Sequence, residues 1–118
     1  MINNKTIVVF AYHNIGLTGI KCLLDNNLTI GLVVTHKDNP KENTWFGSVS
    51  NFCKINKINY ILYEDYDFKK IFSIISSLKP ILIISMYFRK IIPNYILEIP
   101  INGAMNLHGS LLPKYRGR

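Results

Sequence analysis

Short apolar runs alternate with amphipathic segments along the whole chain. The runs that predict strands are residues 6–12, 28–35, 58–63, 80–87 and 103–108. The first, second and fourth runs are continuously apolar, which is typical of strands covered by helices on both faces. Apolar positions recur at helical spacing in residues 15–24, 48–57, 68–78 and 94–98. This alternation over 118 residues predicts a single α/β domain with a Rossmann-like doubly wound, mainly parallel sheet.

Histidines follow several of the predicted strands. His13 comes after the first strand, His36 after the second, and His108 ends the fifth. In a parallel sheet with right-handed crossovers the carboxyl ends of all strands lie at one edge, and ligands of such folds bind there. The polar loop 37–46 leaves the same edge. We therefore expect a functional site at this edge.

The start of the first helical segment has fewer glycines than a dinucleotide-binding turn. Only Gly16 and Gly19 are present where a dinucleotide-binding turn has three glycines, so we do not expect a dinucleotide cofactor. We interpret Gly19 as a point of close packing between helix and strand. The stripe of this helix that is expected to face the sheet contains Ile15, Thr18, Gly19, Cys22 and Leu23. Cys22 and Cys53 lack metal-ligand spacing, so both are expected to be small buried side chains, and no metal is predicted.

The distribution of charged residues along the sequence indicates which classes of partner the chain is expected to bind. The chain has 14 Lys and Arg against 7 Asp and Glu, but the lysines are scattered and only the stretch 114–118 is densely basic. A nucleic-acid partner is not expected, whereas a small anionic ligand fits the basic stretch. No apolar stretch has the length of a membrane span and no signal peptide is recognisable, so a cytoplasmic protein with no membrane partner is expected.

The fifth predicted strand carries the candidate chemistry. Strand alternation puts Asn106 and His108 on the same face. An amide can donate a hydrogen bond to a developing oxyanion, and an imidazole can transfer a proton near neutral pH. A polar strand end that leads into a surface loop is an equally good interpretation of these residues alone. The cluster Glu64, Asp65 and Asp67 is predicted to be a solvated turn that caps the following helix.

A resemblance favours the catalytic interpretation. Residues 106–113, Asn-Leu-His-Gly-Ser-Leu-Leu-Pro, followed by Tyr-Arg-Gly at 115–117, resemble the signature of folate-dependent formyltransferases. Residues 8–13, 35–40, 46–49 and 114–118 are similar to the branch of this family that acts on UDP-4-amino-4-deoxy-L-arabinose. The methionyl-tRNA branch differs, since it carries Gly-Thr-Pro in place of Tyr12, His13 and Asn14, and a tryptophan in place of Tyr115.

The resemblance implies a reaction and residue roles. A formyl group would pass from 10-formyltetrahydrofolate to the 4-amino group of the UDP-amino sugar, without a metal. His108 would transfer the proton and Asn106 would stabilise the oxyanion. The backbone groups of Lys90, Ile91 and Ile92 would bind the folate, with Arg118 close by.

The resemblance also implies what lies outside the sequence. The family's third catalytic residue, an aspartate, comes downstream of Arg118. Residues 1–118 are therefore expected to be the N-terminal part of a formyltransferase catalytic domain, with the sheet incomplete on its C-terminal side. The fifth strand would be an exposed edge, open to self-association or to pairing with a C-terminal half. Weak or absent catalysis by this chain alone, a non-catalytic module that binds folate or nucleotide, and a methionyl-tRNA formyltransferase relative (which the net charge of +7 would favour) all stay open.

Overall fold

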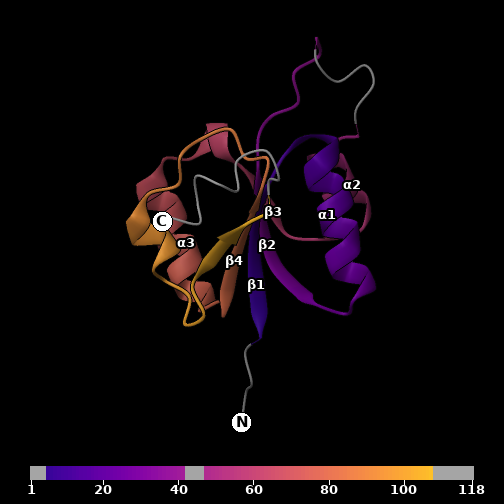
Figure 1. The fold of residues 1–118 in the computed structure, drawn as a ribbon. Helices are drawn as coiled ribbons and strands as arrows, with labels where there is room; N and C mark the ends of the chain where they lie inside the picture. Colours follow the sequence, from indigo (N-terminus) through magenta and orange to yellow (C-terminus); the bar gives the residue numbers. More distant parts are fainter. Residues whose placement is uncertain (1–4, 42–46, 108–118) are drawn as a thin grey trace.

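A five-stranded parallel sheet forms the centre of the molecule (Figure 1). The computed structural model describes residues 5–41 and 47–107. The strands are β1 (Thr6–Ala11), β2 (Thr29–Thr35), β3 (Tyr60–Leu62), β4 (Leu82–Met86) and β5 (Ala104–Asn106). Their order is β3-β2-β1-β4-β5 and every pairing is parallel. The predicted α/β, Rossmann-like fold is confirmed.

Helices cover both faces of the sheet. Helices α1 (His13–Asp25) and α2 (Val49–Ile55) lie on one face, to the right in Figure 1. On the other face are α3 (Phe68–Leu78) and α4 (Asn94–Leu97), with the 3-10 turn η1 (Tyr63–Asp65) between β3 and α3. Each element falls within or next to its predicted segment. No helix within residues 5–41 and 47–107 has the length and apolar character needed to cross a bilayer.

The two faces of the sheet bury separate apolar cores. The core under α1 and α2 contains Ile7, Val9, Ala11, Leu17, Ile20, Leu23, Val33, Val49, Cys53, Ile84 and Met86. The core under α3 and α4 contains Val8, Phe10, Leu32, Val34, Ile71, Ile75, Ile83 and Ile96. Alternate residues of β1, β2 and β4 enter opposite cores, which explains why these strands are apolar at almost every position.

The predicted buried face of α1 is correct at Gly19 and Leu23 and wrong at Ile15, Thr18 and Cys22. The helix buries Gly16, Leu17, Ile20 and Leu23, whereas Ile15 is 47% exposed. Cys22 is likewise exposed, so its predicted burial is wrong, while that of Cys53 is confirmed. The buried face is centred on Gly16, Leu17 and Ile20, because the two glycines of α1 pack directly against Ala11 and Met86.

Close approach of α1 to the sheet requires glycine. A Cβ at Gly16 would lie 2.9 Å from the Ala11 Cβ and 3.2 Å from the Met86 carbonyl oxygen. At Gly19 a Cβ would lie 2.0 Å from the Met86 Sδ. Both glycines therefore pack against the ends of β1 and β4, which confirms the interpretation of Gly19 and brings the start of α1 against the carboxyl edge of the sheet.

Candidate functional site

The strand order creates a switch point between β1 and β4. From β1 the chain runs outward through β2 and β3, then returns to β4 on the opposite side of β1. Connections from the two neighbouring strands therefore leave in opposite directions, and ligands of open α/β sheets bind at such a point. The residues that leave β1 here are Tyr12 and His13, and those that leave β4 are Tyr87 and Phe88. Their side chains are the first candidates for a site.

His13 and Tyr87 both have left-handed backbone conformations at this point. Their φ angles are 67° and 61°, and their rings lie 4.8 Å apart between centroids. The Tyr12 N–H donates a hydrogen bond to the Met86 carbonyl at 3.2 Å, which joins the two turns. A left-handed non-glycine residue costs about 1–3 kcal/mol and is concentrated at functional sites. Of the five such residues in the described chain, Asn27, Lys57 and Lys79 follow helices, whereas His13 and Tyr87 lie together on adjacent strand ends at the switch point.

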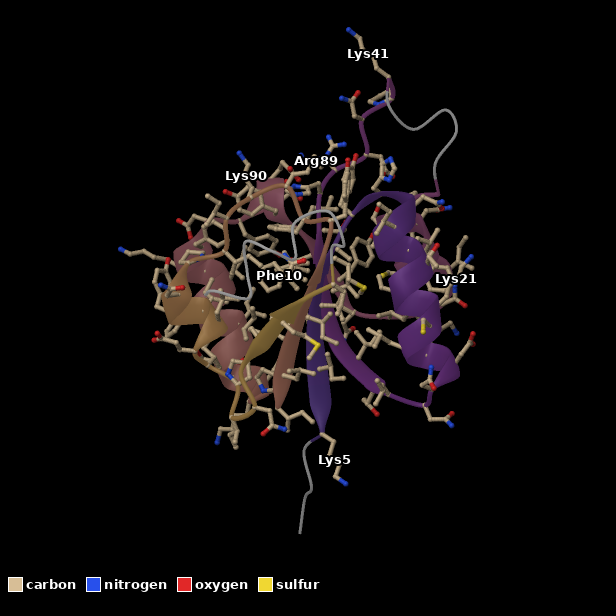
Figure 2. The ribbon with its side chains drawn as sticks, viewed as in Figure 1. Lys5, Phe10, Lys21, Lys41, Arg89 and Lys90 are labelled. Atoms are coloured by element: carbon tan, nitrogen blue, oxygen red, sulfur yellow. The ribbon has the colours of Figure 1, made fainter. Side chains whose placement is uncertain are left out.

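Two cations extend from the β4–α4 connection. The Arg89 guanidinium carbon lies 5.0 Å from the Tyr12 ring centroid and 5.6 Å from that of Tyr87. The Lys90 Nζ lies 5.9 Å from the Tyr63 ring centroid. Figure 2 shows Arg89 and Lys90 together at the carboxyl edge, at the opposite end of the molecule from Lys5. This edge therefore carries positive charge beside aromatic faces, an environment that suits an anionic, partly aromatic ligand.

The segment after Arg89 has unused backbone hydrogen-bonding groups. None of the backbone hydrogen bonds between described residues involves Lys90, Ile91 or Ile92. The side chain of Ile91 is also 92% exposed. A stretch whose backbone N–H and C=O groups have no partner among the described residues, with an exposed apolar side chain, fits a flat heterocycle bound through backbone groups, as the folate interpretation requires.

Asn106 lies at the same edge, at the carboxyl end of β5. It is in register with Ser85 of β4, which is in turn in register with Phe10 of β1. The Leu107 N–H donates to the Ser85 carbonyl at 2.8 Å and continues the pairing beyond the strand. Residues in register share a face of the sheet, so Asn106 belongs to the face covered by α3 and α4. The half-buried amide is held on a paired strand rather than on a free loop.

His36 makes a set of contacts that the sequence analysis missed. Its Nδ1 lies 2.8 Å from Glu64 Oε2, and its Nε2 accepts a hydrogen bond from the Arg89 N–H at 3.1 Å. Its ring stacks on Phe88 with centroids 4.3 Å apart, and its exposed fraction is 5%. Glu64 also accepts from the Lys37 N–H at 2.8 Å. Glu64 lies in an exposed turn, as predicted, but its carboxylate also takes part in a bridge from β2 to η1 and the β4–α4 connection, which the sequence did not indicate.

Burial and hydrogen bonding shift the pKa values of this pair. Desolvation lowers the pKa of His36 below its ordinary 6.5, and the hydrogen bond and charge of Glu64 only partly oppose this. Burial also acts to raise the pKa of Glu64, but the hydrogen bonds from the Lys37 N–H and from His36 outweigh it and lower that pKa. At neutral pH the pair is thus a neutral imidazole and a carboxylate.

The prediction that the acidic cluster caps the following helix is confirmed at Asp67. Asp67 precedes α3, and its Oδ1 accepts from the Lys70 N–H at 2.8 Å, which caps the helix. In the described part of the chain, no group of three or more His, Cys, Asp or Glu side chains could hold a metal ion.

Comparisons with known proteins identify the family. A family model described as formyl transferase matches residues 5–118. The chain belongs to the formyl transferase family. Its fold is similar to the crystal structure of WlaRD, a sugar 3N-formyl transferase determined in the presence of dTDP and 5-N-formyl-THF. The TM-score is 0.55 at 18% sequence identity, over 80% of this chain and 32% of that chain. This formyltransferase-family chain thus spans about a third of that solved relative, and the likeness shows a common fold.

The structure brings together part of the predicted formyltransferase site. Lys90, Ile91, Ile92 and Asn106 all lie at the carboxyl edge, on or after the neighbouring strands β4 and β5. The other two predicted site residues, His108 and Arg118, lie outside the described residues.

Proposed function

We propose that this chain is the N-terminal part of a formyltransferase catalytic domain that moves a formyl group from 10-formyltetrahydrofolate to the amine of a nucleotide-linked sugar. The observation that carries the proposal is the position of Asn106 at the end of β5, next to strand β4 and the segment 90–92, whose backbone makes no hydrogen bond to another described residue. Membership of the formyl transferase family supports it. The folate and the deoxythymidine diphosphate named with the solved relative support both substrate classes.

The residues suggest how the transfer proceeds. The neutral sugar amine attacks the formyl carbon, a new C–N bond forms, and the carbonyl oxygen becomes an oxyanion. The Asn106 amide donates a hydrogen bond to that oxyanion, which stabilises the tetrahedral species. The bond from carbon to the folate nitrogen then breaks as that nitrogen gains the proton that the amine has lost. By resemblance, His108 carries this proton.

The formyl donor is bound along the β4–α4 connection in this proposal. The backbone N–H and C=O groups of Lys90, Ile91 and Ile92 recognise the polar edge of the pterin, and the exposed Ile91 side chain packs against the ring. Arg89 and Lys90 stabilise negative charge on the bound molecules. Arg118 belongs to the same site by resemblance.

We further propose that the acceptor is UDP-4-amino-4-deoxy-L-arabinose. The support is the turn Tyr12, His13 and Asn14, which differs from the Gly-Thr-Pro of the methionyl-tRNA branch. In the structure this turn leaves β1 at the switch point, beside Arg89. Residues at that place are in reach of the substrates, so they are suited to select between acceptors.

A single-turnover formylation assay tests the proposal. The chain is mixed with 10-formyltetrahydrofolate and each of three acceptors: UDP-4-amino-4-deoxy-L-arabinose, a dTDP-linked 3-amino sugar and methionyl-tRNA. We expect at most a slow mass gain of one formyl group on the first acceptor, because the family's aspartate lies downstream of Arg118. With Asn106→Ala the rate should fall by about 100-fold to 1,000-fold, as for loss of one oxyanion donor. Asn106→Asp keeps the shape of the side chain and removes the amide donor, so a rate as low as that of Asn106→Ala would assign the loss to the donor and not to packing.

The outcomes separate the substrate from the reaction. Transfer to another acceptor would overturn the UDP-sugar assignment and leave formyl transfer in place. No transfer, combined with saturable binding of 5-formyltetrahydrofolate, would identify the chain as a folate-binding module that does not catalyse the reaction. Neither transfer nor binding by folded protein would overturn the proposed function.

A further inference from the structure

The β4–α4 connection, residues 87–92, is attached to the neighbouring strand β2 through one buried side chain. The Arg89 N–H, at the centre of this segment, donates to Nε2 of His36, which lies directly after β2. The next residue in the chain, Lys90, begins the stretch whose backbone groups make no hydrogen bond to another described residue. The hydrogen bond of His36 therefore acts immediately before the backbone that folate is proposed to use.

We infer that His36 is a positioning residue of the folate site, which through Nε2 holds the Arg89 backbone so that the backbone groups of Lys90, Ile91 and Ile92 face the ligand. This inference rests on the proposed function. His36 touches neither substrate in it, so it acts through the segment that does.

The neighbours of the imidazole fix its protonation state. The Arg89 N–H is only a donor, so Nε2 must present a lone pair. The Glu64 carboxylate is only an acceptor, so Nδ1 must carry the proton. Each ring nitrogen is thus committed to one partner, and the ring is buried between Phe88 and the edges of Tyr12 and Tyr63. His36 is therefore suited to hold a backbone, and it cannot exchange protons with substrate without losing one of these bonds.

Protonation of His36 would release the segment. A second proton on Nε2 would face the Arg89 N–H, so a hydrogen bond would be replaced by two opposed donors. The charged groups around the ring are Glu64 from η1, which favours the protonated form, and Arg89 and Lys90 from the segment itself, which disfavour it. Tyr12 and Tyr63 contribute ring edges against the imidazole. Folate affinity should therefore be steady near neutral pH and fall on acidification.

Two substitutions distinguish hydrogen bonding from packing. His36→Phe keeps an aromatic ring against Phe88 but leaves the Arg89 N–H without its acceptor. His36→Gln places an amide oxygen near the position of Nε2 and restores the acceptor. The probe is 5-formyltetrahydrofolate, titrated against the 118-residue chain by calorimetry from about pH 5 to about pH 8. We expect the dissociation constant to rise about tenfold in His36→Phe, and to stay within about twofold of the parent in His36→Gln at neutral pH.

The acid dependence is a second readout. In His36→Gln the loss of affinity on acidification should disappear or shrink, because the amide does not titrate in this range. The hydrogen-exchange rate of the Arg89 backbone amide, measured without ligand, is a third readout. This rate should rise by about tenfold or more in His36→Phe but not in His36→Gln.

Failure of the inference differs from failure of the proposed function. If His36→Phe binds the probe as tightly as the parent chain, or if its Arg89 amide exchanges as slowly, His36 does not position the segment. If the folded parent chain does not bind the probe at all, the proposed function is wrong, and Arg89 exchange alone decides whether His36 orders the segment. Equal loss of affinity in His36→Gln and His36→Phe would also overturn the inference, since packing rather than the acceptor would then be responsible.

Discussion

Cys22 and Cys53 have different environments although both lie in helices on the same face of the sheet. Cys22 is exposed on α1, whereas Cys53 lies on the buried face of α2, and burial raises the pKa of the Cys53 thiol to about 11. Because the thiolate is the reactive form, we expect Cys22 to react with a disulfide reagent in the folded chain. Cys53 should react on the order of 100-fold more slowly until the chain unfolds. A time course of thiol release with and without denaturant measures this difference.

Cys22→Ser is the control for the thiol measurement. It should abolish the fast phase and leave the slow phase unchanged, since the two side chains lie in separate environments. Fast reaction of both thiols in the folded parent chain would contradict the burial of Cys53.

For single residues, the spacing in the sequence predicted the place of a residue in the fold better than it predicted the contacts and burial of its side chain. Asn106 was predicted at a strand end and lies there. The bond between His36 and Glu64 was missed because 28 positions separate the two residues, and only the pairing of β2 with β3 brings them together. Cys22 was misplaced because its apolar character was taken as a sign of burial, while the packing of α1 depends on Gly16.

The packing of helix α1 gives a prediction at the scale of elements. Gly16→Ala would put a Cβ 2.9 Å from the Ala11 Cβ and 3.2 Å from the Met86 carbonyl oxygen, and backbone cannot move aside as a flexible side chain can. The gain in helix propensity, about 1 kcal/mol, is smaller than the strain of moving the helix. We expect the free energy of unfolding to fall by about 1–3 kcal/mol, measured by urea titration.

Thr18→Ala is the matched control for this helix. Thr18 is exposed on α1, so the substitution changes propensity without changing the contact with the sheet. It should leave stability unchanged or slightly raised. A Gly16→Ala chain as stable as the parent would mean that α1 does not approach the strands as closely as the structure indicates.

Strand β5 gives a second prediction at this scale. In the described part of the chain β5 pairs only with β4, and Met105 and Leu107 are 49% and 47% exposed. An edge with unpaired backbone groups and exposed apolar side chains favours pairing with another copy. We expect the average mass in sedimentation velocity to rise with concentration, and Met105→Lys to reduce this rise because a charged edge residue opposes pairing.

Ile55→Lys is the control for the edge. Ile55 is 69% exposed on α2, so this substitution adds the same charge and removes a similar apolar side chain away from β5. It should leave the association unchanged. A chain that stays monomeric at every concentration, or that responds equally to both substitutions, would exclude the β5 edge as the contact.

At the scale of the whole molecule, the parallel sheet was predictable and the assembled site only in part. Continuous apolar strands and amphipathic helices in alternation leave few alternatives to a doubly wound sheet, whereas the strand order is known only from the structure, since more than one order obeys the right-handed crossover rule. The position of the site at the carboxyl edge of the sheet is also predictable, because the carboxyl ends of all parallel strands lie at that edge. The left-handed turns at His13 and Tyr87 could not be predicted, since neither is glycine and each depends on contacts between strands distant in sequence.

The buried, hydrogen-bonded His36 makes the free energy of unfolding depend on pH. The folded chain keeps His36 neutral below its ordinary pKa of 6.5, whereas the unfolded chain takes up the proton there. The unfolded state then binds more protons, so the free energy of unfolding must fall as the pH falls below 6.5, by at most about 1.4 kcal/mol per pH unit from this residue. Glu64, whose pKa is lowered, adds a further loss as the pH falls below its ordinary value of 4.5.

Comparison with His36→Gln isolates the contribution of the histidine. Urea midpoints measured from about pH 5 to about pH 8 should fall on acidification in the parent chain, and more gently in the variant, because the amide does not titrate. The two curves should run parallel above neutral pH, where His36 is neutral in both the folded and unfolded states. Parallel curves through the acidic range as well would mean that His36 gains its proton equally in both states, which the buried ring and its bond to the Arg89 backbone do not allow.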